Sequence, residues 1–318
     1  MSLVDAPREG ASASEKGRPG GVPTSSERRR ADSPAALARE AAGNALWILA
    51  IFLIGFAVWF SFASRLHYDR VQHGAYASFR VNLALATAPT GPTQPGDPSK
   101  LLAAGTPVAV LSMPTIGLTS VVFEGSTGLV LEGGPGHLRD TPMPGQPGVS
   151  VILGRRTAYG GPFSRLPRLH VGDAFTVTTG QGVATYRVID LRRQRDPVPP
   201  LPAAGGGRLI LVTADGPPLA PSGVLRVDTD LTSTAKPAPA MVISPVNLAP
   251  SEQALGTEPL AWLPLVGWGG VLLAAACFLA WAGQRWGRWQ TWIVAVPVLG
   301  YLSLTIADQV ARLLPNLL

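Results

Sequence analysis

Cysteine is almost absent from this sequence of 318 residues: Cys277 is the only one, and it lies inside an apolar run. A single thiol excludes intrachain disulfides and metal sites built from cysteine pairs, and it leaves no soluble thiol nucleophile. The sequence also lacks the G-x-S-x-G, H-E-x-x-H and P-loop motifs, so it gives no support for other hydrolases or for nucleotide binding. We therefore expect neither a metal ion nor another cofactor.

Charged residues are also scarce, at 14% of the chain, whereas 46% of the residues are hydrophobic. Soluble domains contain about 25% charged residues, so this balance predicts membrane segments. The formal net charge is +6, but the basic residues are scattered and form no stripe interleaved with aromatic residues. We therefore expect no nucleic-acid partner. The 36 glycines and 31 prolines predict long loops and linkers.

The N-terminal part of the chain divides at its first apolar run. Residues 1–44 are rich in Gly, Ser, Pro, Ala and Arg and have almost no large apolar side chains, which predicts a disordered tail. Residues 45–64 are long and apolar enough for one transmembrane helix. The polar leader is too long for an ordinary signal peptide, so we interpret this helix as an uncleaved anchor.

Two further apolar runs close the chain and predict transmembrane helices at 260–283 and 291–312. The short hairpin between them, residues 284–290, contains Arg285 and Arg288, and basic residues in short loops favour the cytoplasmic side. Arginines before the first run favour the same side for the N-terminus. We expect a multi-pass protein of the cell membrane, with a cytoplasmic N-terminus and an extracellular domain between the first two helices.

Four segments make up this outer part. Apolar residues at helical spacing predict a juxtamembrane helix at 65–88. Residues 89–105 and 235–259 are rich in proline and predict linkers. Residues 106–234 contain short apolar strands bounded by Gly and Pro, which predicts an all-β domain.

One hairpin in this domain is especially clear in the sequence. In DAFTVTTGQGVATYRVIDL, Phe175 and Val177 alternate with polar residues before a Gly-Gln-Gly turn, and Tyr186 and Val188 alternate after it. Six or more such strands at short spacing indicate either a β-sandwich or a closed β-barrel.

The succession of motifs resembles the sortases, the cysteine transpeptidases of Gram-positive cell surfaces, and within them the class E type. The matching pieces, in the family's order, are SMPTIGLTSVVFEG, GGPGHLRDTPMPGQPG, ILGRRTAYGGPFSRLPRLHVGD, the hairpin and LILVTADG. The resemblance implies a mainly-β fold, a sortase-type eight-stranded barrel. It also implies a partner that is a surface-protein peptide segment or a cell-wall component.

Sortase chemistry needs a thiolate nucleophile, a histidine that handles protons and an arginine that steadies the oxyanion. By the resemblance, the cysteine position in LVTADG is Ala214, and the histidine position in ILGRRTAYGGPF is Arg155. The arginine position falls near Gly223 or Val224. Arg226 lies two or three residues further on and is the candidate replacement, because residues two apart share a strand face.

A methyl group cannot attack a carbonyl, and a guanidinium stays protonated and cannot take up a proton. This points to a catalytically degenerate sortase-like protein, a pseudoenzyme that binds or scaffolds a surface-protein segment, an active sortase or another membrane protein. One alternative is a divergent transpeptidase or hydrolase whose catalytic groups are relocated or supplied by a partner. A second alternative is a sensor that signals through the membrane helices.

Five residues are candidates for a ligand-binding groove. Thr213 and Asp215 flank the cysteine position, but no base adjacent to Thr213 is evident, which favours a strand residue that makes a hydrogen bond. His137 occupies a loop in which, by the resemblance, active sortases carry a histidine that is not the base, so it is structural or lines the groove. Arg155 has three interpretations: it pairs with Asp215, it forms a positive groove with Arg226, or it points into solvent.

Overall fold

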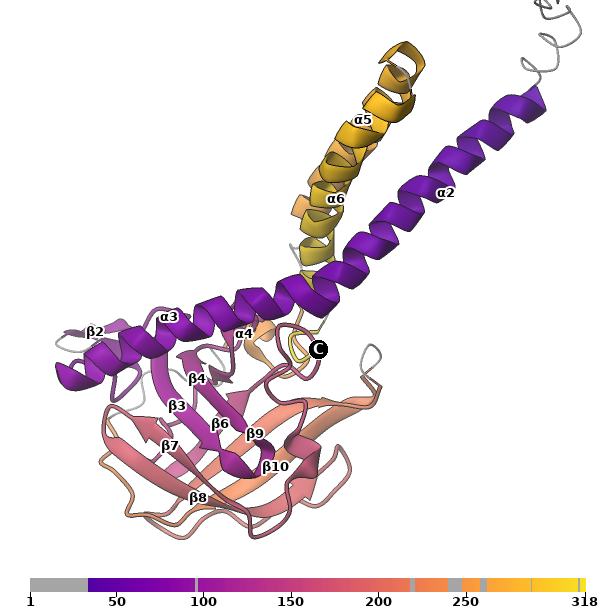
Figure 1. The fold of residues 1–318 in the computed structure, drawn as a ribbon. Helices are drawn as coiled ribbons and strands as arrows, with labels where there is room; N and C mark the ends of the chain where they lie inside the picture. The colour runs from indigo at the N-terminus through magenta and orange to yellow at the C-terminus, as the bar shows by residue number, and fades with distance from the viewer. Residues whose placement is uncertain are drawn as a thin grey trace, which may run out of the picture. The chain divides into compact units, whose positions relative to one another are not determined.

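The computed structural model describes residues 34–94, 97–217, 221–239, 248–257, 262–286, 288–313 and 315–318. The chain divides into two compact units, Met1–Leu49 and Ala50–Leu318. The described residues of the first unit are helical and belong to the start of α2, Pro34–Val58. The second unit contains a β-barrel and the C-terminal helices (Figure 1).

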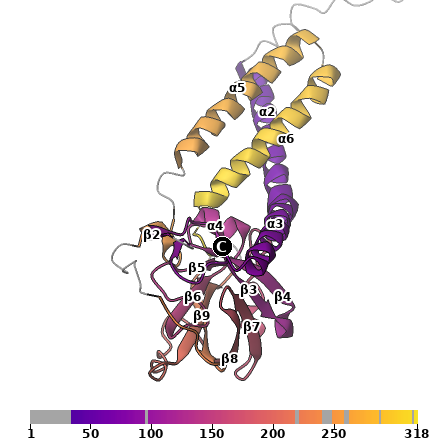
Figure 2. The same ribbon diagram turned by 90° about the vertical axis from the view of Figure 1, so that its left-hand side faces the viewer.

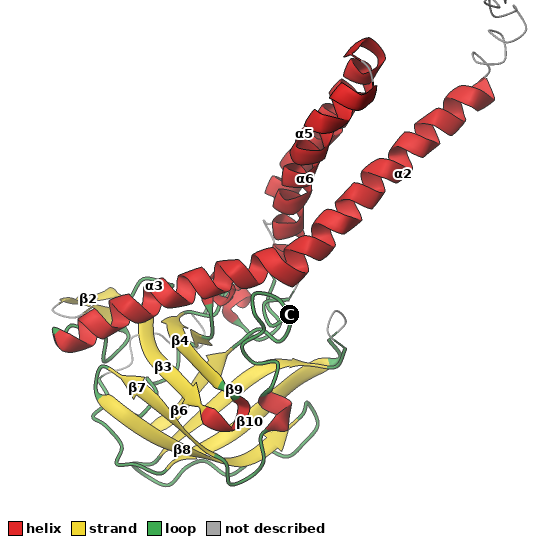
Figure 3. Cartoon of the chain, in the orientation of Figure 1, coloured by secondary structure: helices red, strands yellow, loops and turns green. Residues whose placement is uncertain are grey.

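Eight strands form a closed barrel in which neighbours follow the order β10-β8-β7-β3-β4-β5-β6-β9 (Figures 1 and 3). In chain order they are β3 Pro107–Met113, β4 Leu118–Glu124, β5 Gly136–His137, β6 Gly148–Leu153, β7 Ala174–Thr179, β8 Gly182–Arg192, β9 Gly207–Asp215 and β10 Gly223–Leu231. The expected eight-stranded barrel is confirmed, and the sandwich alternative is excluded. Closure gives every strand two hydrogen-bonded neighbours, so the barrel has no open edge.

The hairpin β7–β8 shows how the sequence pattern produces the barrel. Phe175 lies opposite Tyr186 in the antiparallel ladder, and their rings stack with centroids 5.6 Å apart. Residues 180–181 form the two-residue turn, and Gly182 follows with a φ of 105°, a backbone conformation that favours glycine. The alternation that predicted the hairpin therefore places its large side chains on one face, in the core.

The two faces of the barrel wall have different roles. The interior is filled by a large apolar cluster that includes Val108, Leu111, Ile152, Val177, Leu209, Leu211 and Val227. Successive side chains of a strand point to opposite faces. Consequently Leu209 and Leu211 of β9 fill the interior, whereas Val212 and Ala214 of the same strand belong to a separate cluster on the outer face.

Helix α3, Ser64–Ala84, follows the π-helical turn η1, Trp59–Ala63, and packs against β3 and β4. Ala75 of α3 packs in one cluster with Val121 and Phe123 of β4. The Gln72 side chain accepts a hydrogen bond from the Val121 amide at 2.7 Å and donates to the carbonyls of Val121 and Gly133, at 3.1 and 2.8 Å. The juxtamembrane helix is therefore part of the barrel's packing and not a separate tether.

Two segments are more ordered than the sequence indicated. Helix α2 begins at Pro34, so helix replaces the disorder expected at 34–44, because this stretch is rich in the helix formers Ala, Leu, Arg and Glu. Residues 1–33 lie outside the described part of the chain. Within the expected linker at 89–105, β1 Thr93–Gln94 and β2 Asp97–Leu101 pair as a two-stranded sheet.

The C-terminal helices are α5, Trp262–Trp286, and α6, Arg288–Leu313, which lie side by side (Figure 2). Among the described residues, two helical stretches are long and apolar enough to cross a membrane, Trp262–Leu279 and Trp289–Val310. Three had been expected. The described apolar stretch of α2, Leu49–Val58, is shorter, and the π-helical turn η1 follows it directly.

Leucine truncation inside the barrel tests this architecture. Leu211 of β9 is 0% exposed in the interior cluster, whereas Leu201, in the loop before β9, is 83% exposed. We expect Leu211→Ala to lower the free energy of unfolding by about 2–5 kcal/mol, because it leaves a cavity. The matched control Leu201→Ala should change it by less than about 0.5 kcal/mol. Urea unfolding of the full chain in detergent, followed by circular dichroism, measures both; equal losses would contradict the assigned core.

Candidate functional site

The residues around Ala214 come together because three strands lie side by side. In the antiparallel ladder of β9 and β10, Ala214 lies opposite Val224 and Asp215 opposite Gly223. On its other side β9 pairs in parallel with β6, and Gly154, directly after β6, donates its amide to the Val212 carbonyl at 2.9 Å. The strand register thus brings together the positions that the sortase resemblance assigns to the nucleophile, the histidine and the arginine.

The environment of Ala214 is apolar and closed. Its side chain is 1% exposed. It belongs to an outer-face cluster, here named the Ala214 site, whose buried members are Leu131, Leu153, Val212, Ala214, Val224 and Leu317. Leu131 comes from α4, Gly128–Gly133, which lies over this face. An ionised group placed here would lose its hydration without gaining a polar partner from the cluster.

Arg155 is buried beside this cluster, at 1% exposure, so the interpretation that it points into solvent is wrong. Its Nη2 donates to the Gly128 carbonyl at 2.9 Å, and its Nη1 lies 3.4 Å from the Leu318 carbonyl. The guanidinium also lies over the Tyr159 ring, 4.9 Å from the centroid. Backbone carbonyls and an aromatic face therefore replace the water that an exposed arginine would keep.

Tyr159 extends this arrangement to the C-terminal helices. Its hydroxyl donates to Asp308 Oδ1 of α6 at 3.0 Å, and Trp59 of η1 packs edge-on against its ring at 5.5 Å. Burial raises the pKa of Tyr159, and the nearby carboxylates of Glu132 and Asp308 raise it further. The tyrosine is thus held neutral and acts as a donor between the barrel and α6.

The residues flanking Ala214 have backbone and ion-pair contacts. Thr213 is fully buried, and its hydroxyl donates to the Gly154 carbonyl at 2.9 Å. Asp215 lies 3.6 Å from Arg156 Nη1 and 3.0 Å from Arg193 Nε. Arg156 also donates to the Ala214 carbonyl at 2.9 Å. The arginine next in sequence to Arg155 therefore makes the ion pair with Asp215 that had been considered for Arg155.

Arg226 lies two residues beyond Val224 on the same strand face and opposite Val212. Its side chain is partly exposed. Burial lowers the pKa of Arg226, and the neighbouring Arg192 lowers it further. It occupies the outer face next to the Ala214 site, and its role as the replacement for the family arginine stays a prediction.

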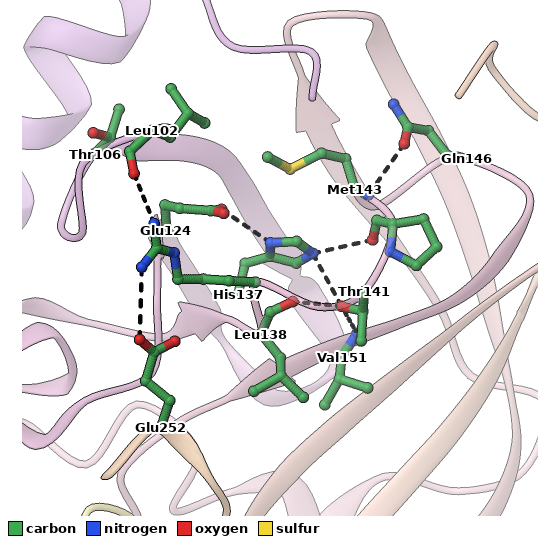
Figure 4. Close-up of polar contacts among 12 residues, drawn as sticks. Leu102, Thr106, Glu124, His137, Leu138, Thr141, Met143, Gln146, Val151 and Glu252 are labelled. Carbon is green, nitrogen blue, oxygen red and sulfur yellow. Dashed lines mark hydrogen bonds and ion pairs between the residues drawn. The ribbon is translucent and has the colours of Figure 1, made fainter. Parts of the chain in front are cut away.

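His137 is part of a different, buried network (Figure 4). Its Nδ1 lies 3.0 Å from Glu124 Oε2, and its Nε2 lies 3.0 Å from the Pro142 carbonyl and 3.2 Å from Thr141 Oγ1. Both ring nitrogens therefore face acceptors, an arrangement that favours the imidazolium form. Burial alone would lower the pKa of His137, but the charge and hydrogen bond of Glu124, together with the Pro142 carbonyl, raise it overall. The His137 ring thus links the loop after β5, through Pro142, to Glu124 of β4.

No sequence pattern indicates one contributor to the site, the segment Pro315–Leu318. Asn316, Leu317 and Leu318 are all buried, and the Leu317 carbonyl accepts a hydrogen bond from the Arg156 amide at 2.9 Å. The last transmembrane helix expected from the sequence, 291–312, ends before them. For metal binding, the described residues offer no group of three or more His, Cys, Asp or Glu side chains.

The His137 network makes a pH-dependent prediction. Because the pKa of His137 is raised in the folded state, its stabilising contribution is complete below the ordinary value of 6.5 and is lost as the pH rises through the folded pKa. We expect His137→Gln to cost about 1–3 kcal/mol at pH 6 and progressively less toward pH 9. Urea titrations across this range measure the loss, with exposed His170→Gln as the control. A loss that is the same at every pH would contradict the imidazolium assignment.

Comparisons with known proteins agree with this fold. The sortase domain model matches residues 111–219, from within β3 to just beyond β9. A mutant of sortase E from Streptomyces avermitilis is 32% identical, covering 42% of this chain and 91% of that chain, with a TM-score of 0.35.

Two further solved structures are each 22% identical to this chain. For the sortase D5 transpeptidase of Clostridium perfringens, the match covers 52% of this chain and 99% of that chain, with a TM-score of 0.42. For the SrtF sortase of Corynebacterium diphtheriae, the match covers 46% of this chain and 92% of that chain, with a TM-score of 0.38. No curated protein matches the sequence. On the family-model match and the 32% identity across most of sortase E, the chain belongs to the sortase family.

Proposed function

We propose that this chain is a membrane-anchored, sortase-like protein whose barrel binds a ligand without cleaving it. The observation that carries the proposal is the chemistry of the Ala214 site. At the position that the resemblance assigns to the nucleophile, a buried methyl group is surrounded by apolar side chains. A sortase needs an ionised thiol at this position, and neither the residue nor its surroundings meet that need.

The contacts of Arg155 support the same conclusion. At the assigned histidine position, a guanidinium donates to the carbonyls of Gly128 and Leu318. A guanidinium stays protonated in proteins and has no acceptor, so it cannot serve as the base for a nucleophile. Its hydrogen bonds link α4 and the C-terminal segment instead.

The flanking residues offer no evident substitute. The Thr213 hydroxyl already donates to the Gly154 carbonyl from a fully buried position. The Asp215 carboxylate is already engaged in ion pairs with two arginines, Arg156 and Arg193. Acyl transfer at this site would therefore need groups brought by a partner.

A binding role fits the kinds of molecule that sortases handle, namely a surface-protein peptide segment or a cell-wall component. The C-terminal helices add a route to membrane partners, including an active sortase. The membrane-length stretch of α5 is almost wholly unburied within the chain, so its apolar side chains are available to lipid or to another protein. We propose that residues 45–64 add a third span, that the N-terminus is cytoplasmic and that the barrel lies outside the cell.

Turnover is the direct test. The full chain in detergent would be incubated with a pool of sorting-signal peptides and an amine acceptor, and products would be followed by mass spectrometry. We expect no cleavage, no transfer product and no covalent adduct from the wild type, because the site lacks a nucleophile and a base. Ala214→Cys in a Cys277→Ala background should also be inactive, because the new thiol still has no base beside it.

An active sortase run with the same peptides is the positive control. Wild-type turnover that is lost in Thr213→Val would overturn the proposal and establish a relocated nucleophile. Peptide retention without turnover would support a binding role.

A further inference from the structure

The segment Pro315–Leu318 covers the Ala214 site. Leu317 is 0% exposed and packs in one cluster with Ala214 and Val224. Both views of the chain show the C-terminus beside α4, which carries Leu131 of the same cluster (Figures 1 and 2). An apolar side chain from a distant part of the sequence thus fills the place above the assigned nucleophile position.

The backbone of this segment is held by the two arginines that follow β6. The Leu317 carbonyl accepts from the Arg156 amide at 2.9 Å, and the Leu318 carbonyl lies 3.4 Å from Arg155 Nη1. Main-chain contacts of this kind accept any residue type, so they hold a peptide backbone without reading its sequence. The selectivity comes from the side chains.

Asn316 supplies one such contact. Its Nδ2 donates to the carbonyls of Ser126 and Gln253, both at 2.9 Å, and lies 3.3 Å from that of Ser251. Its backbone amide donates to the Gly256 carbonyl at 3.0 Å. A primary amide has two hydrogens, so an asparagine at this position can donate to two carbonyls at once, which an aliphatic side chain cannot do.

The fit is nevertheless incomplete. Asn316 Oδ1 is buried and has no hydrogen-bond partner among the described residues, and an unpaired buried acceptor weakens the attachment. The Leu318 contact, at 3.4 Å, is also longer than a strong hydrogen bond. The segment therefore has the properties of a ligand that a competitor can displace.

We propose that Pro315–Leu318, a turn in which the Leu318 amide donates to the Pro315 carbonyl at 3.0 Å, is an intramolecular ligand of the Ala214 site, and that the site takes a peptide of the same chemistry, an asparagine followed by two leucines. The external peptide binds when the chain's own segment leaves. This inference rests on the proposed binding function and names both its ligand class and its regulation. The segment follows α6, whose Asp308 is bonded to Tyr159 beneath Arg155, so movement of the helical pair is coupled to opening of the site.

The expected size of the effect follows from competition within one chain. A short tether gives its ligand an effective concentration of about 1 mM. For an external peptide with a Kd of about 0.1 mM at the open site, the closed chain would show binding about 10-fold weaker.

A cysteine reporter tests this directly in the full chain in detergent. In a Cys277→Ala background, Ala214→Cys places one thiol in the site, and its rate of maleimide labelling reports exposure. We expect Leu317→Ala, alone or with Asn316→Ala, to speed labelling by up to about 10-fold, since the covering side chain is lost. Leu129→Ala, an exposed leucine of α4, is the matched control and should leave the rate unchanged.

The second part of the experiment adds the peptide Pro-Asn-Leu-Leu as a competitor for the site. At millimolar concentration it should return the labelling rate of the opened variants toward the wild-type value, whereas Pro-Ala-Asp-Leu should not. Equal labelling with native and altered segments, or no protection by the peptide, would overturn the proposal. Circular dichroism checks that each variant is folded, and Leu317→Ala alone is used if the double variant is not.

The two tests separate the two proposals. Turnover of peptides by the wild type would refute the non-catalytic function but would leave the labelling result to decide whether the segment occupies the site. Absence of turnover together with unprotected thiol labelling would refute only the intramolecular ligand.

Discussion

The burial of the Arg155 guanidinium is the constraint on which the surrounding structure depends. A cation removed from water must be compensated by oriented dipoles or opposite charge, or the fold loses stability. Here the compensation includes the Gly128 carbonyl of α4, the Leu318 carbonyl and the face of Tyr159. The Arg155 side chain therefore links three parts of the structure: α4, the C-terminal segment and, through Tyr159, helix α6. The loss of any one of these contacts would destabilise the others.

The two faces of β9 depend on different parts of the chain for their packing. Leu209 and Leu211 complete a core that is closed without any contribution from the C-terminal segment. Val212 and Ala214, on the other face, need a cover, and Leu131 and Leu317 provide it. The barrel can therefore keep its fold while the outer face changes its chemistry, which is the physical basis of the proposed binding role.

Much of the fold could be predicted from the sequence because it depends on local alternation. The pattern around Phe175 and Tyr186 predicted the β7–β8 hairpin, since period-two patterning and a two-residue turn are short-range signals. The meeting of Arg155, Ala214 and Gly223 could be expected only from the order of motifs shared with the sortases. The helix from Pro34 was missed because glycine- and proline-rich sequence before it obscured a run of good helix formers.

The rest of the site could not be predicted, because it depends on contacts between residues far apart in the chain. Arginine is usually exposed, and nothing near Arg155 in the sequence indicates that Leu318, 163 residues away, would cover it. Tyr159 and Asp308 are likewise separated by 149 residues. Such contacts form only because the chain comes back to the barrel after the C-terminal helices. The information about the ligand therefore lies in the last residues of the sequence, where periodicity and motif spacing show only the end of an apolar helix.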